Sequence, residues 1–135
     1  MRRHREPVEI TIQYFDGCPN WKDASLAIAE AAREIGLSDG VMCFQRLETD
    51  QEARLLAFRG SPTILIDGID PFAELDAPTG LTCRVFRTEH GLAGRPSLTQ
   101  LQSVLKSAVM TRSGSYGGEE LLTLLRPERD VDRKR

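Results

Sequence analysis

Strict alternation of apolar and polar residues predicts a β-strand over residues 8–15. The apolar positions and the polar positions between them form two sets: Val8, Ile10, Ile12 and Tyr14, and Glu9, Thr11 and Gln13. A period of two places these sets on opposite faces of a strand. Two more apolar stretches predict strands over residues 41–47 and 63–66. The second of these, Thr63-Ile64-Leu65-Ile66, is typical of a strand buried on both faces.

Apolar residues at helical spacing predict three helices. The first begins near Pro19 and ends near Ile35, with Gly36 placed to close it as a left-handed cap. The second is short and ends near Phe58, and Thr49 or Asp50 caps its start. The third follows a Ser97 cap and runs over residues 98–110.

The remaining segments connect these elements. Asp67-Gly68 predicts a tight hairpin turn into a short strand over residues 69–72. Residues 73–96 have no clear period and are expected to form a long loop of the kind that is often functional. The order β-α-β-α-β-β-α predicts an α/β fold, with a mixed four-stranded sheet and helices on both faces.

Length and composition indicate a single folded domain. The chain has 135 residues, of which 40% are hydrophobic and 28% charged, the balance of an ordinary globular protein. We expect a basic N-terminal tail over residues 1–7 and the domain over 8–110. Residues 111–135 are expected to hold a Gly/Ser linker, a short Leu-rich helix and a charged C-terminal tail.

The charge and hydropathy pattern excludes several classes of partner. The formal net charge is −2, so nucleic acid is not an expected partner. No apolar run approaches the roughly 18 residues of a membrane span, and the first residues lack the apolar stretch of a secretory signal. We therefore expect a cytoplasmic protein with no membrane partner.

Three cysteines at wide spacing are the main candidates for chemistry: Cys18, Cys43 and Cys83. In a reducing compartment an odd number does not indicate a disulfide framework. Two histidines are too few, at unsuitable spacing, for a Cys/His zinc site. No metal or other cofactor is expected, and Cys43 is interpreted as a core residue of its strand.

Cys18 precedes the first helix, where backbone dipoles favour a thiolate. Lowering a thiol pKa from about 8.5 to about 7 requires roughly 2 kcal/mol, and a helix N-terminus contributes about 0.3–2 kcal/mol. This predicts a reactive thiol that faces solvent, although Asp16 and Asp23 oppose the shift. The alternative is an inert cysteine that fills space at a strand–helix junction.

The segment Tyr14-Phe15-Asp16-Gly17-Cys18-Pro19-Asn20-Trp21, together with Gly60-Ser61-Pro62-Thr63, resembles the thioredoxin/glutaredoxin superfamily over about residues 8–110. The resemblance implies a thioredoxin-like sandwich, a nucleophile at Cys18, and a cis-proline at Pro62. It also implies ligand contacts by Pro19, Trp21, Ser61, Pro62 and Thr63. Trp21 replaces the second cysteine of the family's motif, which implies an atypical monothiol site. The sequence is also similar to uncharacterised thioredoxin-like proteins, some of which are labelled alkylmercury lyases.

Cys83 is the second candidate, within the expected loop. We expect this loop to fold over Cys18, so that Cys83 resolves an adduct formed there, and we expect Arg84 and Arg87 to favour its thiolate. The alternative is a cysteine packed beneath Val85 and Phe86. The same two thiolates are also suitable ligands for a soft metal such as Hg(II) or Cu(I).

These residues leave three functions open. The leading hypothesis is thiol–disulfide exchange or reversible adduct formation, with a small-molecule or protein thiol or disulfide as substrate. The alternatives are a non-catalytic binding module that uses the surface around Trp21 and Pro62, and soft-metal or organomercury binding by Cys18 and Cys83. The polar face of the first strand and the Leu-rich tail also suggest a homodimer.

Overall fold

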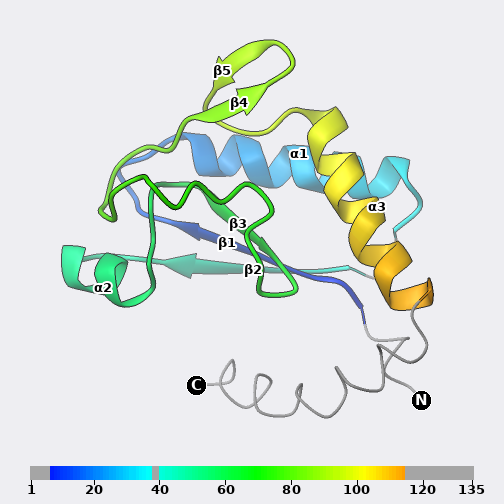
Figure 1. The fold of residues 1–135 in the computed structure, drawn as a ribbon, viewed down its shortest axis with the longest axis horizontal. Coiled ribbons are helices and arrows are strands. Elements are labelled where there is room, and N and C mark those ends of the chain that lie inside the picture. Colours follow the sequence, from blue (N-terminus) through cyan, green and yellow to red (C-terminus); the bar gives the residue numbers. More distant parts are fainter. Residues whose placement is uncertain (1–6, 38–39, 115–135) are drawn as a thin grey trace.

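The structure is a computed structural model that describes residues 7–37 and 40–114. These residues form an α/β fold with three helices, a three-stranded mixed sheet and a separate two-stranded sheet (Figure 1). The elements in chain order are β1 (Glu9–Tyr14), α1 (Asn20–Glu34), β2 (Val41–Arg46), α2 (Asp50–Leu55), β3 (Thr63–Ile66), β4 (Phe86–Thr88), β5 (Gly91–Ala93) and α3 (Leu98–Gly114).

The three-stranded sheet has the order β2-β1-β3, with β1 in the centre. β1 and β2 are parallel and joined by α1, whereas β1 and β3 are antiparallel. In the second pair Ile10 lies opposite Ile66 and Ile12 opposite Ile64, so these side chains share one face. Thr11 and Gln13 lie opposite Leu65 and Thr63 on the other face.

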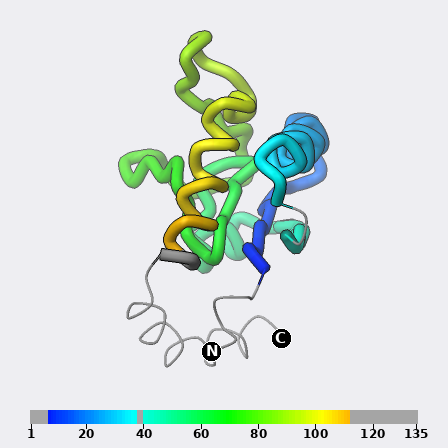
Figure 2. The backbone as a smooth tube through the Cα atoms, turned by 90° about the vertical axis from the view of Figure 1, so that its right-hand side faces the viewer, coloured from blue at the N-terminus to red at the C-terminus, as the bar shows by residue number. Residues whose placement is uncertain are grey.

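α1 and α3 both pack on the isoleucine face of the sheet. The buried cluster contains Val8, Ile10, Ile12, Ala27, Ile28, Ala31, Ile64, Ile66, Leu101 and Leu105. Figures 1 and 2 show the two helices side by side over the strands, with the β4–β5 hairpin projecting beyond them. Both long helices therefore lie on one face of the sheet.

α2 lies beyond the ends of β1 and β2 and forms a smaller core. Leu47, Ala53 and Phe58 are buried there, with Phe15 and Leu81 against them. Thr49 caps the helix: its hydroxyl accepts the Glu52 N–H at 3.0 Å, while the Glu52 carboxylate accepts the Thr49 N–H at 3.2 Å. Ser97 and Gln100 form the same reciprocal arrangement at the start of α3.

The main sheet has three strands because the expected strand over 69–72 does not form. The Asp67-Gly68 turn has positive φ at both positions, and it returns the chain only as far as a single bridge between Ile66 and Ile69. The Asp70 carboxylate then accepts the Phe72 N–H at 2.8 Å, which turns the chain away from the sheet. The expected loop over 73–96 instead contains the β4–β5 hairpin.

Several expectations fall on the ends of the chain. α3 continues to Gly114, past the predicted end near Met110. The basic N-terminal tail before Pro7, the rest of the Gly/Ser linker, the Leu-rich helix and the C-terminal tail lie outside the described residues. Within residues 7–37 and 40–114, no helix is both long and apolar enough to cross a bilayer.

Candidate functional site

The candidate site is built around the backbone of Ser61, two residues before β3. Ser61 and Cys83 form a parallel β-bridge. The Ser61 N–H donates to the Thr82 carbonyl at 2.7 Å, and the Arg84 N–H donates to the Ser61 carbonyl at 2.9 Å. The segment around Cys83 is therefore held against the sheet by main-chain hydrogen bonds and is not a free loop.

Gly60 permits this close approach. Its φ is +130°, and a Cβ at this position would lie 2.8 Å from the Cβ of Arg84. A larger residue would meet both a conformational cost and a clash with the neighbouring backbone. The small residue before Ser61 thus lets residues 82–84 pair with Ser61, just before β3.

Cys18 lies beside the same peptide group and is buried. Its thiol donates to the Ser61 carbonyl oxygen at 3.3 Å, and its exposed fraction is 0%. The expectation that this thiol faces solvent is therefore wrong. Pro19 is exposed and is the N-cap residue of α1, so the helix begins one position later than expected.

Cys83 is exposed and contacts Cys18, and both thiols are free. Hydrogen bonding with Cys18 raises the pKa of Cys83, and burial and the charge of Cys18 add to the increase. The expected lowering by Arg84 and Arg87 is therefore wrong. The structure brings together the two cysteines that the sequence paired, but only Cys83 is open to solvent.

Arg84 has a structural role instead. Its guanidinium donates to Asp70 at 2.9 Å, to the Thr63 hydroxyl at 3.3 Å and to the Phe72 carbonyl, and it lies over the Phe86 ring. Its side chain is only 7% exposed. Arg84 therefore anchors the Cys83 segment to the chain after β3, and its charge is committed to Asp70.

The residues of the Ser61-Pro62-Thr63 motif are all buried. The Ser61–Pro62 bond is cis, as the resemblance implied. The Thr63 hydroxyl donates to the Gly60 carbonyl at 2.7 Å. The Ser61 hydroxyl has no hydrogen-bond partner, and it is the one buried side-chain nitrogen or oxygen atom without a partner among the described residues.

Trp21 packs on the isoleucine side of the sheet. Its ring stacks on Tyr14 at 4.0 Å and meets Phe44 edge-on at 5.8 Å. These contacts give Trp21 a packing role between the first helix and the sheet. Cys43 lies on β2 and is partly buried, with its side chain on the face opposite Ile10 and Ile12.

Gly60 and Asp70 were not predicted as site residues, and Arg84 was predicted there in a different role, beside the Cys83 thiolate. A glycine before Ser-Pro is a signal for close approach of another backbone, but it does not identify the approaching segment. Arg84 and Asp70 are fourteen positions apart in a stretch without periodicity, so no local pattern pairs them.

Comparison of the chain with protein-family models, with curated proteins and with solved structures finds no match. In the described ranges, no three His, Cys, Asp or Glu side chains are grouped to hold a metal ion. What the site can do must therefore be argued from the thiols and their surroundings.

Proposed function

We propose that the protein carries out thiol–disulfide exchange through Cys18 and Cys83. The observation that carries this proposal is the convergence of both cysteines on Ser61. The thiol of Cys18 donates to the Ser61 carbonyl, and Cys83 is the bridge partner of Ser61. Two reduced thiols that lie beside the same peptide group are candidates for a disulfide, which requires Cα atoms within about 7 Å of each other.

We propose a thioredoxin-like arrangement as the finer description of the fold. It is supported by the parallel β1-α1-β2 unit, by the antiparallel β3, and by a cysteine ahead of α1. Ser61-Pro62 directly precedes β3, as the resemblance implies. The fourth strand that the resemblance implies is not in the main sheet, where β3 is an edge strand.

The difference in exposure assigns an order to the chemistry. A substrate disulfide R–S–S–R′ reaches Cys83, whose thiolate attacks one sulfur and displaces R′–S⁻. Cys18 then loses its proton to water and attacks the Cys83 sulfur, which displaces R–S⁻ and forms the Cys18–Cys83 disulfide. Two protein thiols are oxidised, one disulfide is reduced, and two protons leave. This order reverses the roles that the sequence suggests, because Cys18 is buried.

The electrostatics of the pair favour the dithiol at neutral pH. Contact with Cys18 is the main cause of the raised pKa of Cys83, so a smaller share of Cys83 is ionised than for an isolated thiol. Because only the thiolate attacks, exchange accelerates as pH rises through the ordinary thiol range. We infer a site that reacts with activated or abundant disulfides.

The test is oxidation of the Cys43→Ser variant, which retains only the two site thiols, by 4,4′-dithiodipyridine. The proposal predicts release of two equivalents of thiopyridone per chain and a product lighter by two hydrogens, with the bond between Cys18 and Cys83 located by peptide mapping. Adding Cys18→Ser should leave one stable pyridyl adduct on Cys83. Adding Cys83→Ser should leave Cys18 unreactive in the folded chain.

Two other outcomes correspond to the remaining hypotheses. If Cys43→Ser retains two pyridyl adducts and forms no bond between Cys18 and Cys83, exchange is excluded and a binding module remains. Soft-metal binding uses the same thiols, because two thiolates suffice for Cu(I) or Hg(II). Stoichiometric metal uptake that is lost in both serine variants, without disulfide formation, would favour that alternative.

A further inference from the structure

The face of the sheet opposite α1 and α3 carries a groove of about 520 Å³ that reaches Cys83. Gln13, Thr63 and Leu65 of β1 and β3 line it, and so does the segment after β3 through Val85. Sites for small molecules in proteins span about 300–1,000 Å³. The groove is therefore large enough for a small molecule that also contacts an exposed thiol.

Large apolar side chains surround this groove without being covered. Leu56, Leu75 and Val85 line it and are all exposed. Apolar side chains gathered around a concavity are typical of ligand sites, because the ligand removes them from water. An apolar or aromatic group fits this lining.

The charges of the groove leave one cation without an anionic partner. Arg84 and Asp70 pair with each other at 2.9 Å. Glu74 also lines the groove, and its carboxylate pairs at 3.7 Å with Arg87, which lies outside the groove. Arg59 donates only to the carbonyls of Ala77 at 2.6 Å and Ala57 at 3.3 Å, and it forms no ion pair with a carboxylate of residues 7–37 or 40–114. A guanidinium has five N–H donors, so donors remain for a ligand carboxylate.

We propose that the groove binds a disulfide substrate that carries an apolar body and a carboxylate, with the body over Leu65, the carboxylate at Arg59 and the sulfur at Cys83. The proposal rests on the proposed function for its substrate and adds the chemical class. The carboxylate of the ligand would thus be recognised by charge and its disulfide by reactivity, while the apolar lining contacts its body.

The test compares two aromatic disulfides on the Cys43→Ser background. One is 5,5′-dithiobis(2-nitrobenzoate), which carries carboxylates, and the other is uncharged 4,4′-dithiodipyridine. Arg59→Gln should slow the first reaction about tenfold, as expected for losing a charge-assisted hydrogen bond, and leave the second within about twofold. Arg59→Lys should restore part of the difference.

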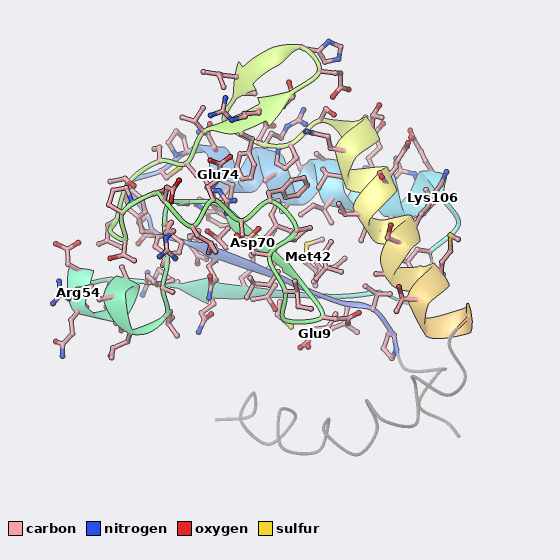
Figure 3. The ribbon with its side chains drawn as sticks, viewed as in Figure 1. Glu9, Met42, Arg54, Asp70, Glu74 and Lys106 are labelled. Carbon is pink, nitrogen blue, oxygen red and sulfur yellow. The ribbon has the colours of Figure 1, made fainter. Side chains whose placement is uncertain are left out.

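Arg54→Gln is the matched control, because it removes the same charge from α2 outside the groove. Figure 3 shows Arg54 on α2, apart from Asp70 and Glu74 on the segment after β3. Equal slowing by Arg54→Gln and Arg59→Gln, or equal slowing of both disulfides by Arg59→Gln, would overturn the proposal. A general loss of fold in Arg59→Gln would show as a lower melting temperature, and the comparison of the two disulfides is then made with Arg59→Lys.

A binding measurement separates this proposal from the proposed function. In Cys83→Ser, amide chemical shifts should move at Arg59 and Leu65 on addition of 2-naphthoate, and much less with 2-naphthol. This result would stand even if no Cys18–Cys83 disulfide forms. Shifts there that follow protein concentration alone would identify a second copy of the chain as the occupant and overturn the proposal.

Discussion

Ser61 and Cys83 are bridge partners, and this pairing holds the exposed thiol beside the buried one. Two backbone hydrogen bonds, at 2.7 and 2.9 Å, flank the bridge. Because main-chain groups make these bonds, replacing either cysteine side chain leaves the pairing in place. The site can therefore be tested one thiol at a time.

Gly60→Ala should weaken this pairing more than a second glycine substitution of similar conformational cost. Gly60 and Gly80 both have positive φ, +130° and +152°, but a Cβ on Gly60 meets the Cβ of Arg84 at 2.8 Å, whereas a Cβ on Gly80 meets nothing within 4 Å. We expect losses in free energy of unfolding of about 3 kcal/mol for Gly60→Ala and about 1 kcal/mol for Gly80→Ala. Urea denaturation measures both.

The same pair of variants also tests the link to chemistry. Gly60→Ala should slow formation of the Cys18–Cys83 disulfide, since residues 82–84 can no longer lie flat against Ser61. Gly80→Ala should leave the rate nearly unchanged. Equal stability losses in the two variants would mean that the approach of Arg84 to Gly60 is not the constraint described above.

Cys18→Ala should make Cys83 more reactive at neutral pH. Hydrogen bonding with Cys18 is the largest cause of the raised pKa of Cys83, and the charge of Cys18 acts in the same direction. Removing both lowers the pKa of Cys83 and raises its thiolate fraction, so its alkylation by iodoacetamide should accelerate several-fold. The measurement is the alkylation rate as a function of pH, followed by mass spectrometry on the Cys43→Ser background.

The sign of this change makes the prediction specific. If Cys18 only shielded or positioned Cys83, its removal would leave the midpoint of the pH profile unchanged. In the intact pair, the raised folded-state pKa also contributes stability below the ordinary thiol pKa, and this contribution is lost as pH rises through the folded-state value. A midpoint that moves upward in Cys18→Ala would contradict the assignment.

Arg84→Met should destabilise the protein far more than Arg87→Met. Arg84 is 7% exposed and bonded to Asp70 and the Phe72 carbonyl, so its removal leaves acceptors without a donor. Arg87 is 79% exposed and 3.7 Å from Glu74. We expect losses of about 3 kcal/mol and at most about 0.5 kcal/mol, measured by thermal or urea unfolding. Similar losses would show that the buried ion pair does not anchor the segment.

Local patterns predicted the elements that local forces determine. Alternation over residues 8–15 identified β1, and the Thr49 and Ser97 caps identified the starts of α2 and α3. Each depends on residues within a few positions of one another, so each leaves a trace in the sequence. The parallel pairing of β1 and β2 followed from the helix between them.

The contacts that make the site depend on distant residues and left no such trace. Ser61 and Cys83 are twenty-two positions apart, and Cys18, which is buried beside Ser61, comes from a third part of the chain. Arg84 is in a stretch without periodicity, where arginine is usually solvated. Contact between Cys83 and Cys18 could therefore be predicted from the sequence. Which of the two thiols is exposed, and the pairing of Arg84 with Asp70, could not.

Ser97→Ala should destabilise the protein most at neutral pH and less on acidification. The pKa of Glu89 is lowered by its own backbone N–H and by the Ser97 hydroxyl, which donates to the carboxylate at 2.8 Å. A lowered pKa contributes stability above the unfolded-state value, about 4.3 for Glu, and that contribution disappears as pH falls through the folded-state pKa. The Ser97 cap on α3 adds about 1 kcal/mol, and this contribution depends little on pH.

Urea denaturation from neutral to acidic pH measures the effect. The difference in free energy of unfolding between wild type and Ser97→Ala should decrease toward the contribution of the cap alone. In a Glu89→Gln background the same substitution should cost a constant amount, and narrowing there would assign the pH dependence to another group.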